Sequence, residues 1–517
     1  MVRLSVEHTG MKLDRIFEIP RYCAFGGFCV LCLWLVSAYL YNAPPVLLLA
    51  GSIAVVGIAV LSWWNILWSL CAFIICIPLV SGLCQTGLLP VSPLSFWFAC
   101  IYLTWLTKKV FFDKKSIRPQ SIIGNLIDTL SAVVVISLIM IMLQYPPDYL
   151  LYRLWPYPAR TQSDPMFSLF AAFILLQGLF LYRIMELEVT GEKTWRRFIP
   201  VFYVHVLTIL IFYLVQVVYN VPAKFRDALI YSPFSSVHSW GSYVVLLLFV
   251  FWGLSRTKGS IRAYGIVVTI LFSCLIFLSS SVSTVAALLI TGCIFVARKF
   301  GARWFMAFSG VILAGLLLIN LYPSILEKSD NYLIERYAKR LIVKTVINPG
   351  SPLYGRYMSA DQTFGILREY PLTGSGIGTF YRISRYYHYS DKPYPRRIEN
   401  AHNYYLQFTA DLGIPALLLF LSIIFCVYRA GVRAIPRYGE YEGFTTGLLF
   451  GLSAYLITML TDHPLILSEQ QFLFWFVIAM ISINYQLADS AEVKKGTGYF
   501  FICEEGISAE VRERFGE

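Results

Sequence analysis

The residues best suited to chemistry gather in one hydrophilic stretch, residues 322–402, which lies between two long apolar runs. The stretch carries twelve Lys or Arg and seven Asp or Glu, a net charge of +5, and His402 closes it. Arg binds phosphate through charge-assisted, often bidentate hydrogen bonds, and neutral imidazole can accept a proton at physiological pH. The composition therefore indicates either a phosphate-bearing substrate or contact with anionic lipid head groups.

Two local elements are predicted inside this stretch. Residues 351–370 read as a helix that Pro371 ends, and its apolar stripe would suit the membrane surface; the stripe consists of Tyr357, Ala360, Phe364 and Leu367. The glycines of Gly374–Gly378 predict a flexible turn whose backbone could approach a glycan or phosphate closely. They do not form a dinucleotide-binding motif, because no strand precedes them.

The sequence gives little reason to expect a metal or cofactor. Glu399 and His402 are spaced as in carboxylate–histidine metal motifs, but no second copy completes such a site. The chain has no Asp-x-Asp pair, which disfavours a metal-dependent nucleotide-sugar transferase. Cys29 and Cys32 lie inside an apolar run and read as packing residues.

The elements that must position these residues are membrane helices. Hydrophobic residues make up 57% of the 517, charged residues 14%, and mean hydropathy is +0.65, whereas a soluble domain carries about 25% charge. A soluble enzyme, a disordered chain and a fibrous repeat are excluded, and the runs are too long for an outer-membrane barrel. The predicted fold is an all-α polytopic membrane helix bundle.

Fourteen membrane spans are predicted. Their approximate limits are 22–41, 46–62, 64–83, 93–107, 121–143, 166–185, 199–219, 238–254, 263–280, 283–297, 304–321, 403–428, 443–460 and 467–486. The uncharged run 263–297 is interpreted as a hairpin broken at Ser279–Ser283, with a short second helix, because one helix of that length would be too long for a bilayer.

Basic clusters fix the expected orientation. Clusters precede the first span and follow the fourth, sixth, eighth, tenth and twelfth, so the positive-inside rule places both termini in the cytoplasm. The predicted organisation is residues 1–321 with spans one to eleven after a cytoplasmic segment, 322–401 as a large periplasmic loop, 402–486 with spans twelve to fourteen, and 487–517 as a cytoplasmic tail.

Several motifs in and after the loop occur in a fixed order. They are Gly355-Arg356, Pro371–Phe380, His402-Asn403-Tyr404-Tyr405-Leu406 and Asp411–Pro415. In this combination the sequence resembles the O-antigen ligase and O-antigen polymerase superfamily. Arg226–Phe234 resembles, more loosely, a second family segment, with Phe234 where Asn is common. Val282 stands where many members carry Arg.

The resemblance implies a membrane glycosyltransferase that uses a polyprenyl-pyrophosphate-linked glycan as donor and a glycan or lipid A core as acceptor. His402 would be the general base, while Arg356 and Arg226 would neutralise the leaving pyrophosphate. Transfer would be metal-independent and inverting. Further substrate contacts are expected from Asn403, Tyr404, Gly374, Gly376, Gly378, Arg382 and Arg397. The expected partners are membrane lipids and a regulator of polysaccharide chain length, and no nucleic acid.

Several alternatives stay open. A polymerase of O-antigen or exopolysaccharide is favoured over a ligase to lipid A core, because fewer spans are expected of ligases; a protein oligosaccharyltransferase is the third enzyme reading. The alternative that is not an enzyme is a transporter or flippase of lipid-linked glycans. It is disfavoured because the spans hold almost no charge and show no repeat. The expected location is the bacterial inner membrane, with the active site at the periplasmic face.

Overall fold

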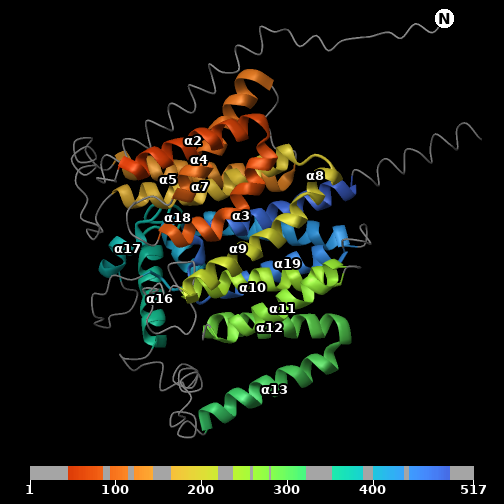
Figure 1. The fold of residues 1–517 in the computed structure, drawn as a ribbon. Coiled ribbons are helices and arrows are strands. Elements are labelled where there is room, and N and C mark those ends of the chain that lie inside the picture. Colours follow the sequence, from red (N-terminus) through yellow and green to blue (C-terminus); the bar gives the residue numbers. More distant parts are fainter. Residues whose placement is uncertain are drawn as a thin grey trace, which may run out of the picture.

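A computed structural model describes residues 45–84, 93–113, 121–143, 165–218, 237–256, 260–278, 281–321, 352–387, 400–435 and 442–489. Within these ranges the regular structure is entirely helical (Figure 1). The helices are α2 (Pro45–Trp64), α3 (Ile66–Cys84), α4 (Pro93–Thr107), α5 (Ile122–Leu143), α7 (Pro165–Glu188), α8 (Glu192–Arg196), α9 (Phe198–Val218), α10 (Val237–Leu254), α11 (Ser260–Leu278), α12 (Val282–Phe300), α13 (Ala302–Leu321), α16 (Pro352–Glu369), α17 (Phe380–Ile383), α18 (Tyr404–Ala434), α19 (Glu442–Thr458) and a last helix, Ser468–Asp489.

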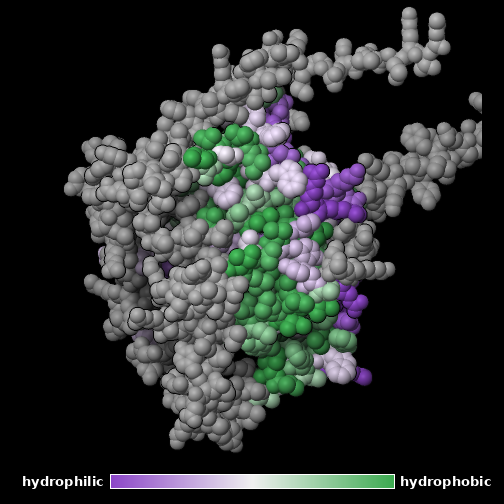
Figure 2. Space-filling model, in the orientation of Figure 1, coloured by the Kyte–Doolittle hydropathy of each residue, from purple (hydrophilic) through white to green (hydrophobic). Residues whose placement is uncertain are grey.

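The predicted helical membrane bundle is confirmed. Predicted span 22–41 lies outside the described residues, and each of the other predicted spans coincides with a described helix. Six of the described helices are long and apolar enough to cross a membrane. Figure 2 shows a broad hydrophobic band over the bundle, with hydrophilic residues along one edge. The chain is therefore a multi-pass membrane protein.

Two helices differ from the sequence-based prediction. The break at Ser279–Ser283 separates α11 from α12 as expected, but α12 is not short: both helices have 19 residues. Predicted span 403–428 is not one regular helix, because Gly413 has non-helical backbone angles (φ 85°, ψ 169°) inside α18. This break is central to the site described below.

Small residues allow α10 and α19 to pack with their backbones in contact. Gly443, Gly447 and Gly451 recur every four residues on one face of α19. A Cβ atom at Gly447 would collide with the carbonyl of Phe249, and one at Gly451 would collide with that of Leu246. Helices in a membrane associate through such close approach because lipid supplies no hydrophobic driving force between them.

The helix Ser468–Asp489 lies in the middle of the bundle and is almost entirely buried. The ring of Phe472 meets the ring of Phe73 edge-on, with 4.7 Å between their centroids. The ring centroids of Phe476 and Phe202 are 5.3 Å apart. His205 of α9 is also buried, between the carbonyl of Ile74 and the hydroxyl of Tyr243, both at 2.7 Å. These contacts make His205 a packing residue.

The two ends of the bundle differ. The loop helices α16 and α17 lie together at the left-hand end in Figure 1, and α8 lies at the opposite end. Since α16 carries Arg356, the candidate chemistry gathers at the left-hand end.

Candidate functional site

Arg356 lies in the first turns of α16, within the helix predicted over residues 351–370. Its side chain is partly buried. Burial lowers the pKa of Arg356, and the nearby carboxylate of Asp462 acts in the opposite direction. Among the residues that the structure describes, no carboxylate forms an ion pair with Arg356. Its guanidinium group therefore keeps donors for an anionic ligand.

His402 has an unusual backbone conformation. Its φ is +49°, and among the described residues it is the one non-glycine residue in the left-handed region. The start of α18, two residues after His402, is fixed to the end of α19. The Tyr404 amide donates to the carbonyls of Met459 at 2.9 Å and Asp462 at 3.0 Å. A strained backbone conformation of this kind persists only where surrounding contacts hold it in place, and such conformations are concentrated at functional sites.

His463 is the neighbour of His402 in space. The two rings meet edge to face with their centroids 5.6 Å apart. The Nε2 of His463 shares a hydrogen bond with the side-chain amide of Asn400 at 3.1 Å. The backbone amide of His463 donates to the carboxylate of Asp462 at 2.9 Å. The segment before α18 and the segment after α19 thus meet at these two histidines.

Asp462 links the two predicted catalytic residues. The charge of its carboxylate stabilises the protonated form of Arg356 and so raises the pKa of that residue. Its backbone carbonyl accepts a hydrogen bond from the amide of Tyr404, two residues after His402. One of its carboxylate oxygens is buried without a hydrogen-bond partner in the described structure, which leaves room for a donor from a ligand or from Arg356. The arrangement can bind an anion at Arg356 and accept a proton at His402.

Asn403 and Tyr404 have structural contacts. Asn403 caps α18, since its side-chain oxygen accepts from the Leu406 amide at 3.1 Å and its amide nitrogen donates to Leu460 at 2.9 Å. Tyr404 lies in the core, with its ring centroid 5.6 Å from that of Phe408. Both residues therefore fix the backbone that presents His402.

The glycine turn is packed rather than open. Gly374, Gly376 and Gly378 all have positive φ. A Cβ at Gly374 would collide with the backbone of Asp411, and a Cβ at Gly376 would lie 2.7 Å from Ile141 of α5. The sequence-based expectation of a flexible turn is thus replaced by a docking element between the loop, α5 and α18.

The turn fills the break in α18, and the sequence explains why the break occurs. In a continuous helix the carbonyl of Asp411 would need an amide from residue 415, which is Pro415 and has none. Instead the Gly376 amide donates to Asp411 at 2.9 Å, and the Ser375 amide donates to Ala410 at 2.8 Å. Broken helices at membrane depth require such replacement partners.

The side chain of Asp411 strengthens this joint. Its buried carboxylate accepts a hydrogen bond from the Phe380 amide at 2.8 Å. The backbone amides of Gly378 and Thr379 also hydrogen-bond to it. Three backbone amides of the loop therefore donate to one buried side chain of α18. The amides that could have held a substrate phosphate here are already occupied by the protein's own carboxylate.

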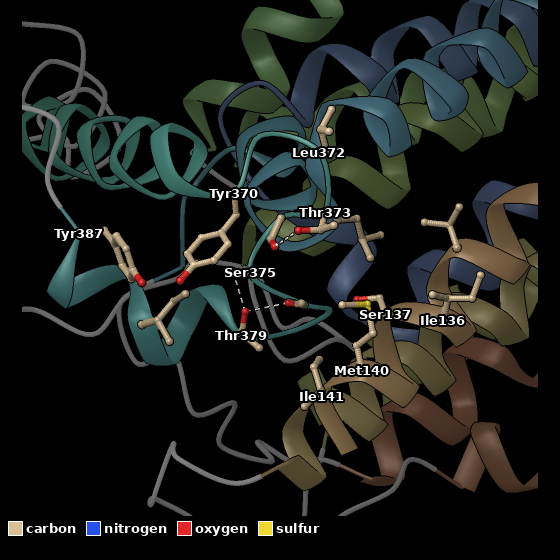
Figure 3. Close-up of a pocket in the computed structure, with 15 residues that line it drawn as sticks. Ile136, Ser137, Met140, Ile141, Tyr370, Leu372, Thr373, Ser375, Thr379 and Tyr387 are labelled. Atoms are coloured by element: carbon tan, nitrogen blue, oxygen red, sulfur yellow. Dashed lines mark hydrogen bonds between the residues drawn. The ribbon is translucent and has the colours of Figure 1, made fainter. Parts of the chain in front are cut away.

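A cavity of about 550 Å³ adjoins the turn. Figure 3 shows Ile136, Met140 and Ile141 on one side of it, with Tyr370 and Tyr387 on the other. The described residues that line it include neither Arg356 nor His402, and none of them is charged. One wall is apolar and the other carries hydroxyl groups, so the cavity suits the uncharged part of an amphipathic ligand.

The remaining predicted site residues are placed in part. Arg226 and Arg397 lie outside the described residues, and Arg382 belongs to α17. Sequence reasoning missed Asp462 and His463. A signal was available, because Asp462-His463-Pro464 places two polar residues directly after predicted span 443–460, at the end that the basic clusters put outside.

Comparison with known families identifies the part of the chain that carries this site. The family model described as O-antigen ligase matches residues 267–421. The match contains Arg356, the glycine turn and His402, and it ends before Asp462. A search of curated proteins finds no match to the chain. The match over residues 267–421 supports the resemblance of this part of the chain to the O-antigen ligase and polymerase superfamily of membrane glycosyltransferases.

Proposed function

We propose that this protein transfers an oligosaccharide or polysaccharide from undecaprenyl pyrophosphate to an acceptor hydroxyl at the periplasmic face of the bacterial inner membrane. The single observation that carries the proposal is the convergence on Asp462 of the helix bearing Arg356 and the segment bearing His402. A cation for the leaving pyrophosphate and a base for the acceptor proton are the two groups that this transfer needs.

The proposed chemistry is a single displacement. His402 accepts the proton of the acceptor hydroxyl as its oxygen forms a bond to the anomeric carbon. The bond from that carbon to the pyrophosphate oxygen breaks, and the leaving group takes the electron pair. Arg356 and Arg226 stabilise the charge that develops there. One displacement inverts the anomeric centre, and no metal ion takes part.

The other predicted substrate residues divide into two groups. Asn403, Tyr404 and the glycines of Gly374–Gly378 position His402 and the loop, as their contacts suggest. Arg382 and Arg397 remain proposed contacts to the donor or acceptor. The uncharged cavity beside the turn suits the isoprenoid portion of the donor.

The proposed role within glycan assembly is polymerisation of O-antigen or exopolysaccharide units, with ligation to lipid A core as the alternative. A deletion strain distinguishes them through its surface and carrier-linked glycans. Loss of long chains with one repeat unit left on the core supports the polymerase. Bare core with polymer still on the carrier supports the ligase and overturns the polymerase.

The transfer itself is tested with detergent-solubilised protein and purified lipid-linked donor. His402→Ala should lower the rate by about 10²–10⁴-fold, while protein level and donor binding stay close to wild type. His388→Ala is the control, since His388 lies in the same basic stretch without the His402 motif. Normal transfer by His402→Ala would contradict the assignment of His402 as the general base. Absence of any glycosidic product from the wild-type protein would favour the flippase reading.

A further inference from the structure

A second cavity, which unlike the first is lined by charged residues, lies at the end of the bundle away from His402. It has a volume of about 370 Å³ and forms where α10, α12, α18 and α19 end or begin. Its lining residues are Arg256, Phe295, Arg298, Lys299, Ile435, Glu442, Thr446 and Phe450. Three cations thus share one small cavity with one carboxylate.

Two of the three cations, Arg256 and Lys299, contact aromatic rings. The guanidinium carbon of Arg256 lies 4.0 Å from the ring centroid of Trp252 and 5.2 Å from that of Phe295. The ammonium group of Lys299 lies 5.8 Å from the Phe295 centroid. Among the described residues no carboxylate forms an ion pair with Arg256, Arg298 or Lys299. Cation–π contacts orient these groups without neutralising their charge.

The cavity is separate from the glycan site. α19 begins at Glu442 in the cavity and ends at Thr458, just before the loop that holds His463. Its 17 residues correspond to about 25 Å of helix. The cavity therefore lies a membrane-scale distance from His402, at the end that the basic clusters predict to be cytoplasmic. Anionic lipids attract such basic groups at that surface.

An apolar track leads from the cavity along α12. Ile294 and Ile290 precede Arg298 by four and eight residues, so they lie on the same helix face. Both are exposed in the structure, Ile294 by 46% and Ile290 by 47%. Phe295 and Phe450 form the apolar wall of the cavity, with ring centroids 5.8 Å apart. Cations at a helix end above an exposed apolar face match a phosphate group with attached acyl chains.

We propose that this cavity binds the head group of an anionic phospholipid, with the phosphate between Arg298, Lys299 and Arg256 and an acyl chain along Ile294 and Ile290. The single negative charge of the lipid offsets part of the net positive charge of the cavity, and the bound lipid fastens α12 to the α10–α19 pair. The ligand class is a glycerophospholipid of net negative charge, such as phosphatidylglycerol.

The test compares two double variants of the full-length protein in nanodiscs. Arg298→Gln with Lys299→Gln removes two exposed cations of the cavity, and Lys193→Gln with Arg196→Gln removes two exposed cations of α8, which lines no such cavity. Each is reconstituted in phosphatidylcholine with increasing phosphatidylglycerol, and retained lipid is measured by native mass spectrometry. The cavity variant should bind phosphatidylglycerol roughly thirty-fold more weakly than wild type, and the α8 variant should match wild type.

Two results with these variants would overturn the lipid site. One is unchanged phosphatidylglycerol binding by the cavity variant. The other is equal weakening in both variants, which would show an effect of general surface charge. A third arm adds inorganic phosphate to wild-type protein in phosphatidylcholine alone. If phosphate raises the thermal midpoint as much as phosphatidylglycerol does, the occupant is a soluble phosphate and the lipid assignment fails.

Discussion

The ring of His402 meets the ring of His463 edge to face, 5.6 Å between centroids. The two residues are 61 positions apart, on opposite sides of α18 and α19. The family match at residues 267–421 includes His402 but not His463. The candidate site therefore includes a part of the chain beyond the matched residues. If it is the active site, substitutions on both sides of residue 421 should affect the same reaction.

Replacement of Arg356 should impair turnover more than binding. Arg356→Ala should lower the turnover rate by about 10²–10³-fold, as expected for loss of one group that stabilises the leaving charge. Arg356→Lys should recover only part of it, because an ammonium group cannot form a bidentate pair with phosphate. Arg368→Ala is the control, since Arg368 is exposed on the same helix. Full turnover by Arg356→Ala with purified donor would remove Arg356 from the mechanism.

Asp462 should act through Arg356. Asp462→Asn keeps the carbonyl that holds Tyr404 but removes the charge that faces Arg356. We expect Asp462→Asn alone to lower the turnover rate. In the double variant it should add little to the loss that Arg356→Ala already causes. A double-mutant cycle on transfer rates measures this coupling. Independent, additive losses from the two substitutions would show that Asp462 does not position Arg356.

The joint between the glycine turn and α18 should be sensitive to a single methyl group. Gly413 has φ 85°, and a Cβ there would collide with the Leu372 carbonyl. Gly413→Ala should destabilise the protein by more than about 2 kcal/mol and should reduce transfer although it touches no reacting group. Thermal unfolding in detergent measures this effect. Gly310→Ala, at a position with open space around it, should shift stability by no more than about 1 kcal/mol.

The predicted orientation can be tested with reporter fusions. Fusions within residues 108–118, 256–262 and 429–437 should report the cytoplasm, because these segments carry the basic clusters. Fusions within 322–402 should report the periplasm. A cytoplasmic signal from residue 360 would contradict both the span count and the proposed side of the reaction. A periplasmic signal from 256–262 would also move the proposed phospholipid cavity to the other leaflet.

The helices of this protein follow from its amino-acid sequence. A helix that crosses a membrane needs only a sufficiently long apolar run. This property is local, so the predicted limits agree with α2–α5, α7, α9–α13 and α16 to within a few residues. The positions of Arg356 on a loop helix and of His402 before α18 were also predictable, because motifs of fixed order surround them. The break at Gly413 could have been anticipated from Pro415, which cannot supply the amide that Asp411 needs.

How these pieces meet depends on tertiary packing. Arg356 and Asp462 are 106 positions apart, and nothing in local spacing brings a carboxylate from the end of α19 to a helix of the loop. The same holds for Tyr404, whose aromatic side chain suits an interface by type but is buried by packing against Phe408. The glycine turn suggested a phosphate cradle from its composition. In the folded chain its amides donate to the carbonyls of Ala410 and Asp411, which the broken helix left without helical partners, and the Asp411 side chain accepts the Phe380 amide.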